Sequence, residues 1–184
     1  MISHLLTGLT NLASLPTILL MLFGMVIGML VGMLVTDGVA LADDLPRAGA
    51  FSGTYTSFGT IKATPVGKDR LLFVFDEDGL LQTDGFSDKA RMHCWLLGDY
   101  TNGEGQEHGL CLAIDPSGDQ TVSNVITAKH KLGNHIQATA TFAGGTGKYA
   151  GITGSSHFSL DDTGHPSQTN YLLNGPVKGT YKLP

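Results

Sequence analysis

Positive charge is scarce and scattered in this sequence. The chain has 11 Lys and Arg against 16 Asp and Glu, which gives a formal net charge of −5 at pH 7, and no stretch concentrates the basic residues. Proteins that bind nucleic acid need a basic patch to meet the phosphate backbone. The composition therefore predicts no nucleic-acid partner.

Charge of either sign is absent from residues 1–36, and residues 18–35 have no polar side chain. A run of that length can cross a bilayer. Ala40 and Ala42, which follow it, are small residues at the two positions that a signal peptidase reads. Two interpretations stay open for residues 1–42: a signal peptide cleaved after Ala42, which predicts a secreted or periplasmic protein, or a hydrophobic helix kept as a membrane anchor for an exported domain. In both, contact with a membrane is confined to residues 18–35.

Helical periodicity is also lacking, since no stretch of residues 43–184 keeps it over three turns. This part is rich in Gly, Thr and β-branched residues, with turn signals at short intervals. It predicts one all-β domain, 43–184, folded as a closed antiparallel β-barrel of about eight strands. The predicted strands are 53–63, 70–75, 80–83, 90–97, 109–114, 121–128, 135–142, 154–160, 170–173 and 178–182, with turns at 76–79, 115–119, 132–134 and 161–164.

A glycine-rich run at 144–151 looks like a phosphate-binding loop and fails the test for one. A P-loop needs Gly five residues before the Gly-Lys pair and Ser or Thr after the Lys, but Phe142 and Tyr149 occupy those positions. We interpret the run as a barrel corner with Lys148 exposed. The structural residues of this corner are Gly144, Gly145, Thr146, Gly147, Tyr149 and Gly151.

The same run, Gly-Gly-Thr-Gly-Lys-Tyr-x-Gly, resembles a segment of bacterial secreted proteins related to the allene oxide cyclase and dirigent barrels. A second point of resemblance is His93-Cys94 followed by Glu107-His108-Gly109-x-Cys111 and Asp115-x-x-Gly118-Asp119. The resemblance implies an eight-stranded, calycin-like barrel and a possible homo-oligomer, a trimer as in plant members. It carries over no catalytic residue.

Only two cysteines are present, Cys94 and Cys111. In an exported protein they favour a disulfide between successive strands. A zinc site that adds His93 and His108 is the competing interpretation, and free thiols are a third. Strand alternation argues against the zinc site, because adjacent residues such as His93 and Cys94 point to opposite faces. The pairing puts Met92, Cys94, Leu96 and Ala113 on one face and Arg91, His93, Trp95, Leu97, Leu110, Leu112 and Ile114 on the other.

If the second of these faces lines the barrel, Arg91, His93 and Trp95 form a candidate ligand site, with polar groups in an apolar pocket. The alternative is that His93 is an ordinary wall or solvent-facing residue. His108 is expected in a mobile polar loop, 102–107 and its surroundings.

The sequence predicts no cofactor and no metal. Asp115, Ser117 and Asp119 alternate as in a calcium loop, but the position for its bidentate acid holds Ile126. The expected function is an exported small barrel that binds an apolar or amphipathic small molecule, without established catalysis. The alternatives are an isomerase or cyclase acting on a lipid-derived substrate, implied by the resemblance alone, and a structural or protein-interaction module.

Overall fold

The structure, a computed structural model, describes residues 45–184. The predicted signal peptide or anchor at 1–42, with its apolar stretch at 18–35, lies outside the described residues. Within residues 45–184, no helix is both long enough and apolar enough to cross a membrane.

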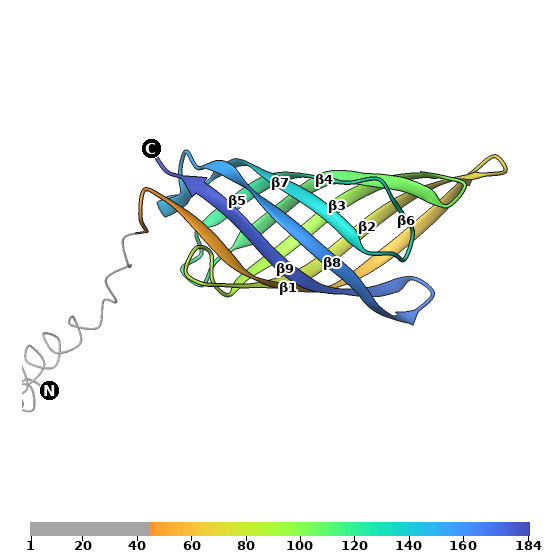
Figure 1. The fold of residues 1–184 in the computed structure, drawn as a ribbon, viewed down its shortest axis with the longest axis horizontal. Coiled ribbons are helices and arrows are strands. Elements are labelled where there is room, and N and C mark those ends of the chain that lie inside the picture. Colours follow the sequence, from red (N-terminus) through yellow and green to blue (C-terminus); the bar gives the residue numbers. More distant parts are fainter. Residues whose placement is uncertain (1–44) are drawn as a thin grey trace, which may run out of the picture. The chain divides into compact units, whose positions relative to one another are not determined.

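The described chain forms nine strands and one short 3-10 helix (Figure 1). They are β1 (Ala48–Val66), β2 (Arg70–Thr83), β3 (Ala90–Thr101), β4 (Glu104–Ile114), β5 (Gln120–Thr127), β6 (His130–Lys131), β7 (Ile136–Gly145), η1 (Gly147–Tyr149), β8 (Thr153–Ser167) and β9 (Asn170–Lys182).

Eight of these strands close into an antiparallel barrel. The order is β3-β2-β1-β9-β8-β7-β5-β4, and a further pairing of β3 with β4 joins the two ends. The short strand β6 pairs with the beginning of β4. This architecture confirms the predicted all-β barrel of about eight strands, and closure leaves none of the eight long strands as a free edge.

Several strands are longer than predicted, and two expected turns are wrong. Residues 76–79 continue β2 and residues 161–164 continue β8, so acidic residues beside Gly did not mark turns there. A tight turn occurs instead at Asn102–Gly103, whose φ angles of 55° and 76° are typical of a type I′ hairpin. Because this turn takes only two residues, Glu107 and His108 belong to β4 and not to a mobile loop.

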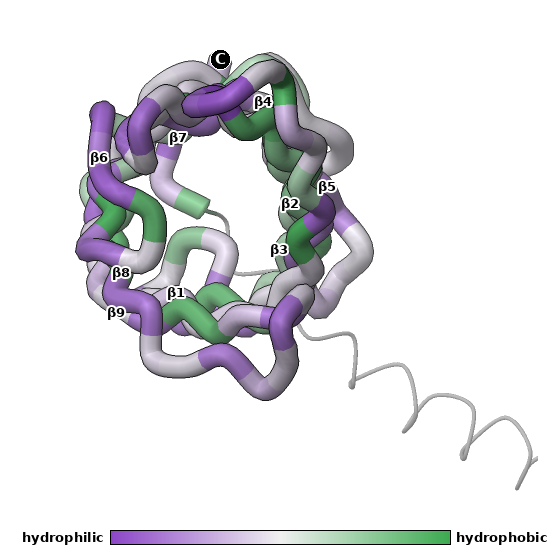
Figure 2. Tube along the Cα trace, turned by 90° about the vertical axis from the view of Figure 1, so that its right-hand side faces the viewer, coloured by the Kyte–Doolittle hydropathy of each residue, from purple (hydrophilic) through white to green (hydrophobic). Residues whose placement is uncertain are grey.

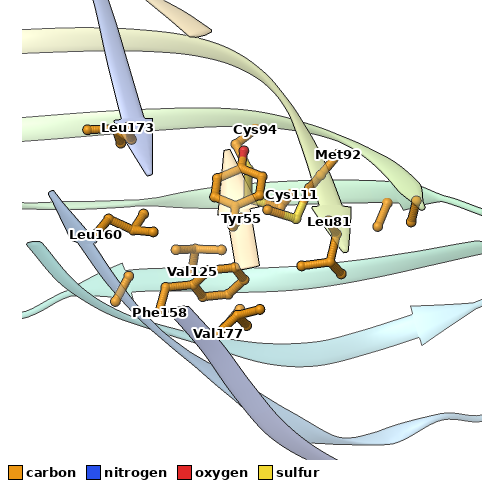
Figure 3. Close-up of a cluster of buried hydrophobic side chains, with 14 of the residues drawn as sticks. Tyr55, Leu81, Met92, Cys94, Cys111, Val125, Phe158, Leu160, Leu173 and Val177 are labelled. Atoms are coloured by element: carbon orange, nitrogen blue, oxygen red, sulfur yellow. A yellow bond between two sulfur atoms is a disulfide. The ribbon is translucent and has the colours of Figure 1, made fainter. Parts of the chain in front are cut away.

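Alternation along the strands separates an interior from an outer face. On β2, Phe73, Phe75, Glu77 and Leu81 are buried on the inward face, whereas the alternate residues Val74, Asp76, Asp78 and Leu80 face outward. Figure 3 shows the interior where Tyr55, Leu81 and Phe158 approach the disulfide between β3 and β4. The apolar interior is therefore built by one face of every long strand.

Aromatic side chains fill one end of the barrel, where β1 begins and β9 ends; we call it the closed end. The ring of Phe86, in the β2–β3 connection, stacks on Tyr181 at 4.4 Å and on Phe51 at 4.7 Å between ring centroids. Tyr149 meets Phe86 edge-on at 5.4 Å. We call the other end, where β1 turns into β2 and β8 into β9, the open end; Figure 2 looks into the barrel from there.

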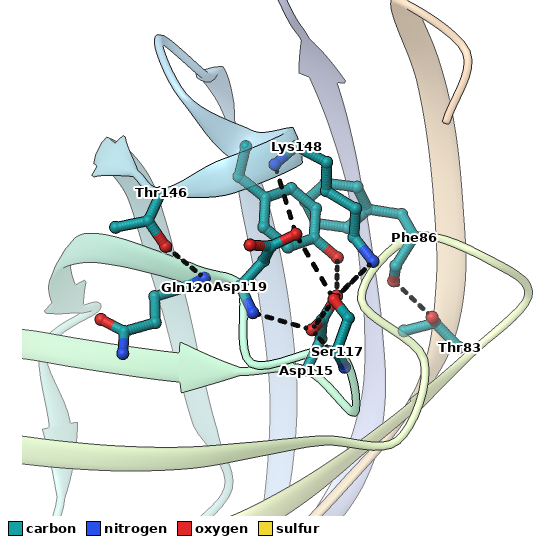
Figure 4. Close-up of polar contacts among 9 residues, drawn as sticks. Thr83, Phe86, Asp115, Ser117, Asp119, Gln120, Thr146 and Lys148 are labelled. Atoms are coloured by element: carbon teal, nitrogen blue, oxygen red, sulfur yellow. Dashed lines mark hydrogen bonds and ion pairs between the residues drawn. The ribbon is translucent and has the colours of Figure 1, made fainter. Parts of the chain in front are cut away.

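The glycine-rich run forms the connection between β7 and β8 at the closed end (Figure 4). Tyr149 is buried and donates a hydrogen bond to Asp115 Oδ2 at 3.0 Å. Lys148 was expected to be exposed, but its side chain is only 30% exposed and forms an ion pair with Asp115. The buried Asp115 carboxylate therefore links the corner to the β4–β5 connection, and these contacts contribute to stability.

Candidate functional site

The three residues predicted as a ligand site, Arg91, His93 and Trp95, lie on the outer face of β3. Trp95 is 50% exposed, and His93 Nδ1 lies 2.7 Å from Asp78 Oδ1 of the neighbouring strand. Their position follows from alternation, because Cys94 between them points into the barrel. None of the three lines the cavity described below, so the interior site is built by other residues.

The disulfide links Cys94 of β3 to Cys111 of β4, which lie directly opposite each other in the register. Both cysteines are buried and both line the interior. The zinc interpretation does not fit this arrangement, because His108 faces outward and the two sulfur atoms are bonded to each other. Within residues 45–184, no cluster of three or more His, Cys, Asp or Glu is placed to hold a metal ion.

The barrel encloses a cavity of about 810 Å³. Most of its lining side chains are apolar, with Phe73, Phe75 and Phe158 in the interior. Toward the open end the lining continues to exposed residues such as Leu132 and Gln168, whereas Phe51 and Phe86 bound it at the closed end. The cavity thus has the size and apolar character of a small-molecule site with one route of entry.

A buried carboxyl group, Glu77 of β2, lies in this cavity at the level of the disulfide, opposite Cys94. Glu77 Oε1 accepts a hydrogen bond from the Tyr55 hydroxyl at 2.7 Å, and Oε2 accepts one from the Tyr171 hydroxyl at 2.9 Å. Burial raises the pKa of Glu77; the two tyrosine hydrogen bonds offset part of this rise, and the nearby Glu107 adds to it.

Two glycines make room for these tyrosines. The Tyr171 ring lies over Gly59, its direct partner on β1, and the Tyr55 ring lies over Gly79 on β2. A Cβ atom at either glycine would overlap the tyrosine ring. In the sequence, Gly79 looked like part of a turn. In the structure it lies inside β2, where its lack of a side chain leaves room for the Tyr55 ring, whose hydroxyl group donates a hydrogen bond to Glu77.

A second buried carboxyl group, Glu107 of β4, lies closer to the open end. Glu107 Oε1 accepts a hydrogen bond from the Tyr100 hydroxyl and lies 3.5 Å from His130 Nε2. The backbone N–H of Glu107 donates to Thr127 Oγ1 at 2.8 Å. Glu107 Oε2 is buried and accepts no hydrogen bond from any group of residues 45–184.

His130 belongs to the short strand β6, which holds it beside Tyr100 and Glu107. Its Nδ1 lies 3.0 Å from the carbonyl oxygen of Ala128 and must carry a hydrogen there, because a carbonyl only accepts. Its Nε2 lies 3.0 Å from the Tyr100 hydroxyl oxygen. The Tyr100 hydroxyl group therefore lies within hydrogen-bond distance of both the imidazole and the carboxyl group.

The tyrosines of this site stay protonated at neutral pH. Burial, together with the negative charge of Glu77, raises the pKa of Tyr55 and Tyr171, and burial with the hydrogen bond to Glu107 raises that of Tyr100. They act as hydrogen-bond donors to the two carboxyl groups. Chemically, the site offers carboxylate acceptors and a possible acid–base group in apolar surroundings.

Sequence reasoning missed both carboxyl groups. Glu77 was assigned to a turn and Glu107 to a loop. Yet the predicted Cys94–Cys111 pair contained the signal for Glu107: counting back from Cys111 in steps of two gives Gly109 and Glu107 on the same inward face. The signal was lost because residues 102–107 were interpreted as a polar loop, whereas the hairpin turn takes only Asn102 and Gly103.

Comparisons with known proteins complete the description. No protein-family model matches the sequence, and no curated protein matches it. Among solved structures, the chain is similar to the structure of the pterocarpan synthase dirigent protein GePTS1, with 12% sequence identity, a TM-score of 0.44, and coverage of 76% of this chain and 89% of that one. The strand pairing of this chain confirms the closed, eight-stranded architecture that the sequence resemblance implied.

Proposed function

We propose that this protein binds an apolar or amphipathic small molecule inside its barrel. The observation that carries the proposal is the cavity of about 810 Å³, lined mainly by apolar side chains and holding two buried carboxyl groups. Cavities of this size, apolar with few polar groups, are typical of small-molecule sites. A barrel with a structural role alone gains nothing from leaving such a volume unfilled, since packed interiors are more stable.

We further propose that the protein acts outside the cytoplasm, as a secreted or periplasmic protein or an exported domain on a membrane anchor. The disulfide between Cys94 and Cys111 supports this, because such bonds persist in oxidising compartments. An exported binding protein meets its ligand in the medium or at the cell envelope.

Binding of a neutral apolar fluorophore, N-phenyl-1-naphthylamine, tests the proposal, because its emission rises in apolar surroundings. We expect saturable binding to the purified protein. Ala140→Phe places a ring in the cavity and should weaken binding about ten-fold or more, because the ring occupies volume that the fluorophore needs.

Thr141→Phe is the matched control, because Thr141 is the next residue of β7 and is exposed on the outer face. It should bind like the wild type. Emission that never saturates, or equal binding by both variants, would contradict a site inside the barrel.

A second candidate function, an isomerase or cyclase, is supported by one observation, the convergence of Tyr100, Glu107 and His130, of which Glu107 and His130 line the cavity. Such a group can move a proton between two atoms of a bound substrate. Incubation with a panel of lipid-derived epoxides, followed by mass spectrometry and chiral chromatography, tests it. Turnover that Glu107→Gln abolishes would favour the enzyme, and no turnover of any compound favours the binding protein.

A further inference from the structure

The ionisable side chains buried in the barrel interior are mainly acidic. Glu77 and Glu107 are both 4% exposed and both line the cavity, and no Arg does. The one Lys in the lining, Lys62, is an exposed residue near the open end. His165, also in the lining, has its Nε2 2.6 Å from Asp162 Oδ2 and is exposed. The buried lining therefore presents two carboxyl groups and one imidazole, that of His130, and Asp162 adds a third, partly buried carboxyl group to the lining.

The two carboxyl groups differ in what remains free. Both oxygens of Glu77 already accept tyrosine hydrogen bonds. On Glu107, the contacts of Tyr100 and His130 are all with Oε1, and Oε2 is left without a donor. A carboxylate oxygen that is taken out of water and left unpaired costs free energy until a donor reaches it.

Glu107 Oε2 is thus a buried acceptor without a donor, on a side chain that lines the cavity. A donor on a bound molecule would satisfy it, and a positively charged donor would gain the most, because charges interact strongly where water is excluded. A carboxylate at the same place would meet the Glu107 carboxylate, with the Glu77 carboxyl group also in the lining, in a low-dielectric space. The same geometry therefore disfavours fatty acids and other anionic amphiphiles.

We propose that the cavity selects amphiphiles with a cationic nitrogen, whose ammonium group donates to Glu107 Oε2 while the apolar part packs against the phenylalanines of β2. This inference rests on the proposed small-molecule binding and names the class of ligand. Tyr100 and His130 act as positioning residues, since they hold the Glu107 carboxylate through Oε1 and leave Oε2 for the ligand.

Displacement of bound N-phenyl-1-naphthylamine by three compounds with one common tail tests the selectivity at pH 7: decylamine, 1-decanol and decanoate. We expect decylamine to displace the fluorophore at a concentration about ten-fold lower than decanol, because both can donate a hydrogen bond to the carboxylate but only the ammonium group adds the attraction of opposite charges. Decanoate should be the weakest of the three.

Glu107→Gln should remove the preference, so that decylamine and decanol displace the fluorophore at equal concentrations. Glu104→Gln is the matched control, because Glu104 lies on the same strand but is exposed and pairs with Lys129 at the surface. It removes the same charge from the protein and should keep the preference for the amine. A preference lost equally in both variants indicates surface attraction only and overturns the proposal.

The outcomes separate this inference from the binding function. If the fluorophore binds but decanol or decanoate competes as well as decylamine, the ligand class is wrong and the binding function stands. If the wild type does not bind the fluorophore at all, the binding function fails and this inference fails with it. Should Glu107→Gln not fold, Glu107→Asp withdraws the carboxylate by one methylene group and is expected to weaken the amine preference about three-fold, and an unchanged preference would overturn the proposal.

Discussion

A buried carboxyl group lies toward each end of the barrel, and the two groups differ in their hydrogen-bond and ion-pair partners. At the closed end, the Asp115 carboxylate accepts hydrogen bonds from Tyr149 and Ser117 and pairs with the Lys148 ammonium group (Figure 4). Toward the open end, and among the residues 45–184 that the structure describes, Glu107 has no Lys or Arg paired with it and keeps one oxygen without a donor. Both side chains are buried to a similar degree, so the difference lies in their partners.

The comparison shows how one fold separates stability from function. A buried charge with full compensation holds connections together, whereas one with partial compensation lowers the free energy of unfolding. Proteins retain the second kind where a ligand or a reaction needs it. On this argument the closed end stabilises the barrel, and the cavity beyond it is available for binding.

The aromatic packing of the closed end should give the largest effect. Phe86→Ala removes the ring that stacks on Tyr181 and Phe51, and we expect the free energy of unfolding to fall by about 4 kcal/mol. Urea denaturation followed by circular dichroism measures it. Phe58→Ala is the control, since Phe58 is 46% exposed on the outer face and should change stability by less than about 1 kcal/mol. Equal losses would show that the closed end is not the stabilising region.

The compensated carboxylate should give an intermediate effect with a defined pH dependence. Burial alone would raise the pKa of Asp115, but hydrogen bonds from Lys148, Ser117 and Tyr149 outweigh it and lower the pKa from 3.8 to about 2. Because the folded-state pKa is the lower one, the stabilisation is present above about pH 4 and is lost as the pH falls from 4 to 2. We expect Asp115→Asn to cost about 2 kcal/mol at pH 7.

Urea denaturation at pH 7 and at pH 2.5 tests this, because the difference between wild type and Asp115→Asn should shrink at the lower pH. Asp69→Asn, at an exposed turn between β1 and β2, is the control and should match the wild type at both values. A difference that is constant with pH would show that the Asp115 contacts do not depend on its charge.

The uncompensated carboxyl group should give the smallest effect, with the opposite sign. Glu107→Gln keeps an acceptor for the Tyr100 hydroxyl and removes the charge that lacks a full set of donors. We expect the free energy of unfolding to rise by about 1 kcal/mol at pH 7. Differential scanning calorimetry of Glu107→Gln, Asp115→Asn and the wild type tests whether the two substitutions change stability in opposite directions. A loss of stability in both variants would contradict the proposal that the Asp115 carboxylate stabilises the barrel and the Glu107 carboxylate does not.

Local sequence patterns were sufficient for the barrel and for the cysteine pairing. Alternation around Cys94 and Cys111 correctly grouped Met92, Cys94, Leu96 and Ala113 on one face. It did not say which face is the interior, because Trp95 and Leu97 make the outer face of β3 as apolar as the inner one. The predicted ligand site at Arg91, His93 and Trp95 followed from choosing the wrong face.

The strand boundaries failed for a related reason. Asp-Glu-Asp-Gly at 76–79 is typical of a turn when each residue is judged from its neighbours in the sequence. In the barrel, Asp76 and Asp78 face outward, Glu77 finds two tyrosine hydroxyl groups, and Gly79 accommodates the Tyr55 ring. Those partners come from β1 and β9, which no local pattern around β2 can show.

The sequence by itself determined the class of fold, because strand alternation and turn chemistry are local properties of the backbone and its side chains. It also determined which cysteines pair, since only two are present. Closure of the barrel decided which face became the interior. It brought Tyr55, Glu77 and Tyr171 together from three strands, and it left Glu107 Oε2 buried without a donor. The site depends on contacts between residues far apart in the chain, and only the tertiary structure fixes those contacts.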